Sequence, residues 1–446
     1  MRSLEIDEIT KRWFAIETES GVFADRSPGI PWWDAVRYRV NEFVVASLAD
    51  QAPQPAMRRV LARRALGFAK RAALRASLAI RARVRNHDVL VLRAPRQLQD
   101  GVPFDRGIDD LRDICRGRQL TIDTYPYYYH LPRRGAVRRE VNVGSALDSL
   151  LKALRAEFGP TWDESELRVL IARLLSDFLM DKAAYGALIA RVRPRLILMT
   201  QNGLEKALFA AAREARVPVL EAQHGLIGFS HFAYSYPREA EYGDRSTFPS
   251  VFSAFSNYWL KTCYYPADRC VALGNDRLAV SAAPADHVGE IMFISGDIYH
   301  AILAGWVKGL ASAAPERHLI YKLHPNQQTA CAAIRQEFAG FANVEVVDGS
   351  VSARTLLHKV THVVLIQSTV ALEALQMGRS LCVLPHLHYR THEDLFRLPA
   401  VTVTADMASL LDAVRRRPPA VTPPSFFDPL DTDAARRLFD EIKRDG

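Results

Sequence analysis

The sequence predicts an α/β protein of two domains, each built around a parallel sheet. Short apolar runs alternate with helical stretches along most of the chain, an order typical of parallel strands covered by helices. The alternation forms two series, separated by the small, polar stretch 279–289. We therefore expect a first domain at 1–278, a linker at 279–289 and a second domain at 290–446.

The first series follows a helical N-terminal region, whose apolar residues recur at helical spacing: Trp33, Val36, Val40, Phe43, Val44 and Leu48. Its buried runs begin with "DVLVLRA", whose continuous apolar character is typical of a parallel strand covered on both faces. Strands are expected at 88–94, 118–125, 193–203, 218–225, 250–256 and 268–278. Helices are expected at 145–192, with a break near Gly159-Pro160, and at 204–216.

The second series contains five apolar runs, each ending in polar or small residues. These strands are expected at 290–297, 318–325, 344–350, 362–369 and 380–386. Since ligands of open parallel sheets bind outside the carboxyl ends of the strands, the residues that end these runs are the candidate site.

Composition limits the class of protein and its partners. Of the 446 residues, 49% are hydrophobic and 24% charged, as in soluble globular proteins. The net charge of +8 indicates an anionic partner: a nucleotide, a lipid headgroup or a nucleic acid. Residues 57–86 hold ten Lys or Arg and no acid, which fits either a solvated basic helix or peripheral contact with an anionic membrane. No nucleic-acid motif is present, so we expect no nucleic-acid partner.

The cysteines and the N-terminus indicate a cytoplasmic protein, with the basic stretch as its candidate for peripheral contact at the inner membrane. The five cysteines form no CxxC pair and fit no zinc spacing, so free thiols in a reducing cytosol are expected. "MRSLEIDEITKRW" lacks the apolar core of a signal peptide, and no run of 18 apolar residues occurs.

Polar residues at the ends of two runs of the second series predict a phosphate site. Ser295 and Gly296 end one run, and Gln367, Ser368 and Thr369 end another. Ser368 and Thr369 also stand where the next helix begins, and hydroxyls with exposed backbone N–H groups can hold an anion there. The alternative is that these residues only cap the helix, and both roles can coexist.

A further run ends in His324-Pro325, and its imidazole can donate to a phosphate or help a leaving group depart. The alternative is a structural histidine. Lys322 lies two residues earlier on the same face and is either a second phosphate partner or a solvated edge residue.

In the first series, "LEAQHGLIG" (220–228) is the informative strand end. Glu221 or His224 could remove a proton from an acceptor hydroxyl, whereas the alternative is a hydrogen-bonded turn around the glycines. Gln201 and Asn202 end the neighbouring run and are either acceptor contacts or a turn pair. Asp297, in the second series, is an acceptor contact or a helix cap.

Several motifs are absent from the chain. It has no P-loop, no G-x-G-x-x-G after the first run, no H-E-x-x-H, no G-x-S-x-G and no Asp-x-Asp at a run end. We therefore expect no cofactor and no metal, and a nucleotide leaving group stabilised by dipoles, hydroxyls and histidine.

Four segments together resemble one family. They are "EAQHGLIG" (221–228), "CVALGNDRL" (270–278), "YKLHP" (321–325) and "QSTVALEAL" (367–375). They are similar to motifs of GT-B glycosyltransferases of bacterial surface polysaccharides: capsule-type Kdo transferases, bacterial sialyltransferases and, more distantly, CDP-glycerol glycerophosphotransferases. The resemblance covers roughly residues 194–386, and Asp276 stands where the family has proline.

The resemblance implies two facing Rossmann-like domains. It also implies that His324, Ser368 and Thr369 hold the nucleotide phosphate, that Glu373 contacts ribose or base, and that His224 lies in the cleft. The acidic base motif of sialyltransferases is not present in clear form, so Glu221 and His224 are candidates from position alone.

The expected function is metal-independent transfer of a sugar, CMP-linked Kdo or a sialic-type sugar, from a nucleotide donor to a capsule or lipopolysaccharide acceptor, a glycan or glycolipid. Trp32-Trp33 and Tyr125–Tyr129 could be sugar platforms, or the tryptophans could pack in the core. The alternatives are a UDP-sugar 2-epimerase-like isomerase, which needs no acceptor, and a non-catalytic partner in polysaccharide assembly.

Overall fold

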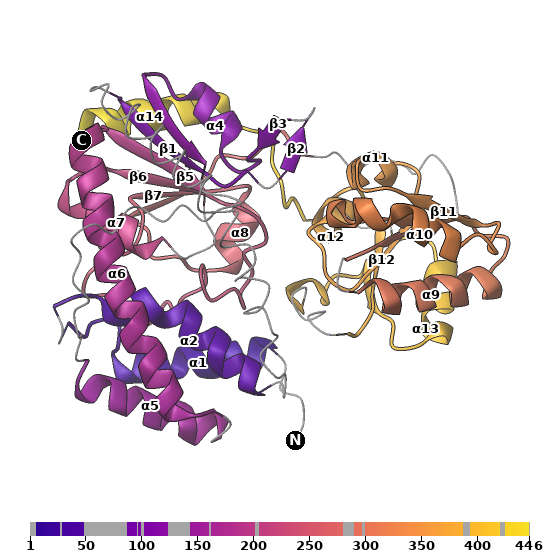
Figure 1. The fold of residues 1–446 in the computed structure, drawn as a ribbon, viewed down its shortest axis with the longest axis horizontal. Helices are drawn as coiled ribbons and strands as arrows, with labels where there is room; N and C mark the ends of the chain where they lie inside the picture. The colour runs from indigo at the N-terminus through magenta and orange to yellow at the C-terminus, as the bar shows by residue number, and fades with distance from the viewer. Residues whose placement is uncertain are drawn as a thin grey trace. The chain divides into compact units, whose positions relative to one another are not determined.

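The computed structural model divides into two compact units, each with one large sheet (Figure 1). The described residues are 6–26, 29–48, 87–95, 97–99, 102–123, 143–159, 162–200, 205–279, 290–296, 299–386, 393–419 and 424–445. The first unit comprises Ile9–Arg277 with Pro429–Gly446, and the second comprises Leu278–Asp428 with Met1–Glu8.

The sheet of the first unit has six parallel strands in the order β4-β1-β5-β6-β7-β8. The strands are β1 (Val89–Arg93), β4 (Gln119–Asp123), β5 (Leu196–Thr200), β6 (Val219–Ala222), β7 (Val251–Ala254) and β8 (Arg269–Ala272). All six lie within the predicted ranges. A separate two-stranded antiparallel sheet is formed by β2 (Gln97–Gln99) and β3 (Val102–Phe104). The sequence pattern did not indicate it, because each strand has only three residues.

The helices of the first unit lie on the sheet and beside it. They are α1 (Ile6–Ser20), α2 (Trp32–Leu48), α4 (Asp109–Ile114), α5 (Ser145–Phe158), α6 (Glu164–Val192), α7 (Lys206–Glu214), α8 (Asn257–Thr262) and α14 (Thr432–Asp445). Figure 1 shows α1, α2, α5 and the lower part of α6 grouped below the sheet. α6 begins with a capped turn, since the Asp163 carboxylate accepts from the backbone N–H groups of Ser165 and Glu166.

A buried ion pair joins α1 to α2. The Glu17 carboxylate accepts from Arg37 Nε at 2.6 Å and Arg37 Nη2 at 2.9 Å, and from the indoles of Trp13 at 3.1 Å and Trp33 at 2.8 Å. Arg37 also donates to the Phe232 carbonyl. Burial, the largest single cause, lowers the pKa of Arg37, but the charge and hydrogen bonds of Glu17 together with neighbouring tyrosines outweigh it, so the pKa is raised. Both Trp32 and Trp33 are fully buried, so core packing rather than a sugar platform is observed for this pair.

The second unit repeats the architecture with six parallel strands in the order β11-β10-β9-β12-β13-β14. The strands are β9 (Ile291–Ile294), β10 (Leu319–Lys322), β11 (Val344–Val347), β12 (His362–Leu365), β13 (Ser380–Val383) and β14 (Val401–Val403). Its helices are α9 (His300–Ala313), the 3₁₀ helix η1 (Pro325–Ala330), α10 (Cys331–Glu337), α11 (Ala353–Leu357), α12 (Val370–Gln376) and α13 (Met407–Arg415). All five predicted strands are present, and β14 is an addition.

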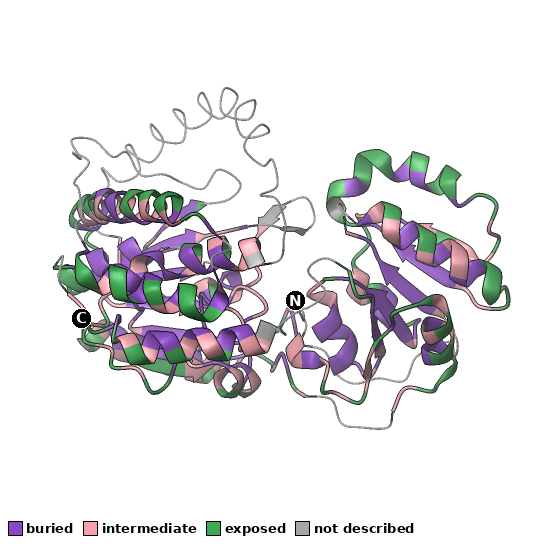
Figure 2. Cartoon of the chain, turned by 90° about the horizontal axis from the view of Figure 1, so that it is seen from below, coloured by how far each residue is buried: buried purple, intermediate pink, exposed green. Residues whose placement is uncertain are grey.

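Burial explains why the apolar runs of both series become strands. Every residue of β5, β6, β7, β9, β10 and β12 is buried, as a strand between two helical layers requires. Figure 2 shows buried strands in both units under helices with exposed outer faces. The predicted fold class, two Rossmann-like α/β domains with parallel sheets, is confirmed.

The C-terminal helix α14 belongs to the first unit, which differs from the predicted second domain at 290–446. Its apolar residues Ala435, Leu438, Phe439 and Ile442 recur at helical spacing and pack into the core around β1 and β5. Ion pairing of Glu441 with Arg269 at 2.8 Å adds to the contact. The predicted linker 279–289 lies, apart from Ala279, outside the described residues.

Two further predictions concern the whole chain. The five cysteines form no disulfide. Within the described ranges, no helix combines the length and the apolar character that crossing a bilayer requires. The basic stretch 57–86 and Tyr125–Tyr129 lie outside the described residues.

Candidate functional site

The strand order of the second unit defines a switch point between β9 and β12. From β9 the chain adds β10 and β11 on one side, and then returns to place β12, β13 and β14 on the other side. Ligands of open parallel sheets bind outside the carboxyl ends of the strands at such a point. Ser295 and Gly296 follow β9, and Gln367, Ser368 and Thr369 follow β12. The structure therefore brings these predicted residues together on both sides of the switch point.

Tyr299 links the two strand ends, and the sequence reasoning missed it. Its hydroxyl donates to Gln367 Oε1 at 3.3 Å. Its ring lies against Gly296, where an added Cβ would be 2.8 Å from Tyr299 Cδ2. The same ring meets the edge of His386, which follows β13, with centroids 6.2 Å apart. Only a residue without a side chain fits at 296 beside this ring, which explains the glycine.

Ser368 and Thr369 precede α12, a helix of seven residues. The Ser368 hydroxyl accepts from the Val370 N–H at 3.2 Å, so the local contact that the capping alternative predicts is present. Thr369 is the N-cap residue and makes no side-chain cap bond. A helix this short has a weak dipole, so an anion here depends on the hydroxyls more than on the dipole. Glu373, in the first turn of α12, is buried.

His324 is exposed and caps η1. Its ring Nδ1 accepts from the backbone N–H of Asn326 at 3.2 Å, and the backbone N–H of His324 donates to Gln327 Oε1 at 2.9 Å. Because Nδ1 accepts, the neutral ring carries its proton on Nε2. The structural contact therefore fixes a tautomer whose Nε2–H is the group that could donate to a phosphate. Pro325 is the first residue of η1, a position where proline costs no hydrogen bond.

Lys322 lies at the end of β10 and is buried. Its ammonium donates to the carbonyls of Leu323 at 2.6 Å and Asp348 at 2.9 Å. Burial lowers the pKa of Lys322, while the charge of Asp348 opposes this shift. The ammonium thus hydrogen bonds backbone carbonyls that follow β10 and β11. To contact a phosphate, it would have to break these two hydrogen bonds.

In the first unit, Glu221 lies inside the core and is fully buried. Its two carboxylate oxygens accept from Tyr234 Oη at 2.6 Å and Tyr265 Oη at 2.9 Å. Burial, together with the charge of Glu221, raises the pKa of Tyr265 far above its ordinary value. These contacts give Glu221 a structural task, namely fixing two tyrosines from a distant part of the chain.

His224 follows β6 and is half-buried. Its ring stacks on Tyr234, with centroids 5.5 Å apart, and meets the edge of His231 at 6.0 Å. Burial lowers the pKa of His231 to about 4, so that ring is neutral near pH 7. Tyr234 therefore lies between the two predicted catalytic residues, bonded to Glu221 and stacked on His224.

Glu221→Gln should separate the structural role from a catalytic one. The glutamine amide has one acceptor oxygen and an NH₂ group that cannot accept, so it cannot accept hydrogen bonds from both Tyr234 and Tyr265. We therefore expect the free energy of unfolding to fall by about 1–3 kcal/mol. Turnover of the surviving folded protein should change less than fivefold, measured by initial rates below the melting temperature. Unchanged stability with turnover reduced about a hundredfold would instead assign the proton to Glu221.

A loop that the pattern did not single out covers the ends of β5 and β6. A Cβ at Gly107 would be 2.8 Å from the Gln223 carbonyl and 3.0 Å from Thr200 Cγ2. The Asp105 carboxylate shapes the loop by accepting from the N–H groups of Ala94 at 2.6 Å and Gly107 at 3.0 Å. The glycine after "FDR" was the available signal. The predicted acceptor residues Gln201, Asn202 and Asp297 lie outside the described residues.

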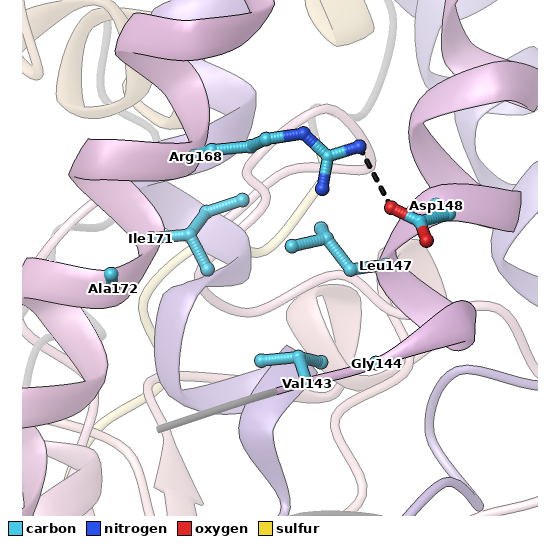
Figure 3. A pocket seen from close by; sticks show the side chains of 7 residues that line it. All are labelled: Val143, Gly144, Leu147, Asp148, Arg168, Ile171 and Ala172. Carbon is cyan, nitrogen blue, oxygen red and sulfur yellow. Dashed lines mark ion pairs between the residues drawn. The ribbon is translucent and has the colours of Figure 1, made fainter. Parts of the chain in front are cut away.

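A cavity of about 260 Å³ lies between α5 and α6 (Figure 3). Its lining residues are Val143, Gly144, Leu147, Asp148, Arg168, Ile171 and Ala172. Arg168 pairs with Asp148 at 2.8 Å across its mouth, and Arg168 and Glu164 pair within α6. None of the predicted site residues lines this cavity, and its charges neutralise each other, so we do not assign the site to it.

Comparison with known protein families gives a match within the second unit. Residues 298–392 match the family model described as capsule polysaccharide biosynthesis protein. Comparison with curated proteins gives no significant match.

Solved structures with a similar arrangement include a Staphylococcus aureus MnaA complex with UDP, at 13% identity and TM-score 0.46, covering 80% of this chain and 96% of that one. The Neisseria meningitidis UDP-GlcNAc 2-epimerase is 12% identical, with TM-score 0.43 over 80% of this chain and all of that one. The spinosyn rhamnosyltransferase SpnG is 14% identical, with TM-score 0.43 over 80% and 96%.

Proposed function

We propose that this protein is a GT-B glycosyltransferase of capsule or related surface-polysaccharide synthesis. The observation that carries the proposal is the switch point of the second unit, flanked by Ser295 and Gly296 after β9 and by Gln367, Ser368 and Thr369 after β12. The capsule family match supports it, because residues 298–392 include most of this set.

The second unit would hold the phosphate of a nucleotide-sugar. The Nε2–H of His324 and the hydroxyls of Ser368 and Thr369 are donors suited to the charge that builds up on a leaving phosphate. Lys322 would join them only by giving up its two carbonyl contacts. Glu373 is buried in the first turn of α12. A ribose or base could contact it only if the ligand approached the beginning of this helix closely.

The first unit would bind the acceptor, a glycan or glycolipid. His224 is the stronger candidate for the base, because it follows β6 and is half-buried, whereas Glu221 is enclosed by tyrosines. Within this proposal the donor is a CMP-linked Kdo or sialic-type sugar, no metal or cofactor takes part, and the enzyme works in the cytoplasm with peripheral contact at the inner membrane.

A thermal-shift screen with CMP, CDP, UDP and GDP tests the donor site. We expect one nucleotide at millimolar concentration to raise the melting temperature, since a ligand that binds only the folded state stabilises it. In His324→Ala the affinity should fall about tenfold, as expected for one lost hydrogen bond to a charged group.

His318→Ala is the matched control. His318 precedes β10, at the amino end of the strand that His324 follows, and its side chain is 41% exposed. It should leave nucleotide binding unchanged. If no nucleotide raises the melting temperature of the wild type, the donor site as described here is wrong.

The same material distinguishes the alternatives. Stabilisation by UDP alone, with conversion of a UDP-sugar in the absence of any acceptor, would indicate a 2-epimerase-like isomerase. Nucleotide binding without turnover of any donor, with or without acceptor, would indicate a non-catalytic partner in polysaccharide assembly.

A further inference from the structure

A chain of hydrogen bonds leads from the switch point of the second unit to its surface. Ser295 Oγ lies 3.0 Å from Tyr321 Oη, and Tyr321 Oη lies 2.8 Å from His300 Nδ1. His300 Nε2 lies 2.9 Å from Glu337 Oε2, whose other oxygen accepts from Lys308 at 2.8 Å. The members come from β10, α9, α10 and the residue after β9, so the chain spans separate elements.

The two ends of the chain differ in burial and charge. Ser295 is 2% exposed and Tyr321 is fully buried, whereas the side chains of His300 and Glu337 are 25% and 34% exposed. Burial raises the pKa of Tyr321 to about 12, so its hydroxyl keeps its proton. The hydrogen bonds from Lys308 and His300 lower the pKa of Glu337, so its carboxylate only accepts.

These constraints fix the direction of each hydrogen bond. Because Glu337 only accepts, His300 Nε2 carries a proton in either state of the ring. When His300 is neutral, its Nδ1 accepts from Tyr321, and the Tyr321 oxygen in turn accepts the proton of Ser295. When His300 is protonated, Nδ1–H donates to Tyr321, Tyr321 donates to Ser295, and the Ser295 proton is released to point elsewhere. One added proton at His300 therefore reverses two hydrogen bonds.

We propose that Glu337, His300 and Tyr321 are positioning residues that turn the Ser295 hydroxyl toward the phosphate of a bound nucleotide when His300 is protonated. This inference rests on the proposed function and adds a control of donor binding to it. The groups that face His300 are Tyr321 from β10 and Glu337 from α10, and Lys308 of α9 meets the same carboxylate.

Access to Ser295 involves Tyr299. The ring of Tyr299 covers the neighbouring Gly296, and its bond to Gln367 at 3.3 Å is long for two oxygen atoms. In this proposal the phosphate takes the place of the ring over Gly296 and rests on the Ser295 hydroxyl. A hydroxyl that donates holds a phosphate, whereas one whose proton is used by Tyr321 presents only lone pairs to it.

The test is the pH dependence of nucleotide affinity, measured by calorimetry with whichever of CMP, CDP, UDP and GDP stabilises the wild type. Between about pH 8 and pH 5, the wild type should gain about tenfold more affinity on acidification than Tyr321→Phe does. The nucleotide titrates equally in both experiments, so the difference reports the protein. Glu337→Gln should abolish the gain, because the amide oxygen would face Lys308 and its NH₂ group would donate to His300 Nε2, which places the proton of the neutral ring on Nδ1 at every pH.

Glu345→Gln is the control, since Glu345 lies 3.6 Å from His318 and offers the same change at another His–Glu pair. It should match the wild type at every pH. Parallel curves for the wild type and a folded Tyr321→Phe would overturn the relay alone and leave the donor site standing. If Tyr321→Phe does not fold, a gain in Glu337→Gln as large as that of the wild type decides against the relay. Absence of nucleotide binding by the wild type at every pH would overturn the proposed function together with the relay.

Discussion

Replacing Arg37 by alanine should lower the free energy of unfolding of the first unit by about 3–5 kcal/mol. Among the described residues, the substitution leaves the buried Glu17 carboxylate with the indoles of Trp13 and Trp33 as its hydrogen-bond donors. It also removes the donor to the Phe232 carbonyl, which comes from a distant loop of the same unit. Urea unfolding followed by tryptophan fluorescence measures the loss, because Trp13 and Trp33 lie at the pair itself.

Arg39→Ala is the matched control on the same helix. Arg39 pairs with Glu42 at 2.6 Å, but both side chains are more than 40% exposed, so its loss should cost below about 1 kcal/mol. Replacing Glu17 and Arg37 together by methionine should recover part of the stability, because no charge then remains buried. Equal losses for Arg37→Ala and Arg39→Ala would show that the buried pair contributes no more than a surface pair.

The double variant Ser368→Ala, Thr369→Ala should weaken nucleotide binding about a hundredfold. Two hydroxyl donors to a phosphate are removed, each worth roughly 1.5 kcal/mol or more when the acceptor is charged. Folding should suffer less, by about 1 kcal/mol, as expected when a capping contact such as that of Ser368 with the Val370 N–H is lost. Calorimetric affinity and urea unfolding of the same preparation compare the two effects directly.

Ser380→Ala makes the same chemical change at the amino end of β13, the neighbour of β12 in the sheet. It should leave nucleotide affinity unaltered. If the folded double variant binds nucleotide as tightly as this control, Ser368 and Thr369 have only the structural role of capping α12.

Much of the fold could be predicted because its signals are local. A run such as 318–325 is apolar, short and ended by proline, and it becomes β10 followed by η1. β14 was missed because two of its three residues are only partly buried and Val403 is exposed, so no buried apolar run marks it. The placement of α14 in the first unit was missed because an amphipathic pattern predicts that a helix packs on a hydrophobic core but does not indicate which of two cores it packs on.

The site was predicted to the extent that it depends on strand ends. The residues after β9 and β12 could be identified from the sequence, since the polar positions directly follow apolar runs. The role of Glu221 could not, because its partners Tyr234 and Tyr265 lie 13 and 44 residues further along the chain. The same holds for His300 and Glu337, which come together only when α9 and α10 pack on one face of the sheet.

The return of α14 to the first unit has a consequence for synthesis on the ribosome. Leu430 and Asp431 are hydrogen bonded to Asp276 and Leu273, so the second unit is in effect an insertion between neighbouring points of the first. A helix that is translated after residues 278–428 thus completes the hydrophobic core of the first unit. During translation, one side of that core therefore stays uncovered until the whole insertion has left the ribosome. A premature stop near residue 428 would remove α14 and so destabilise the first unit, although most of that unit is translated before the stop.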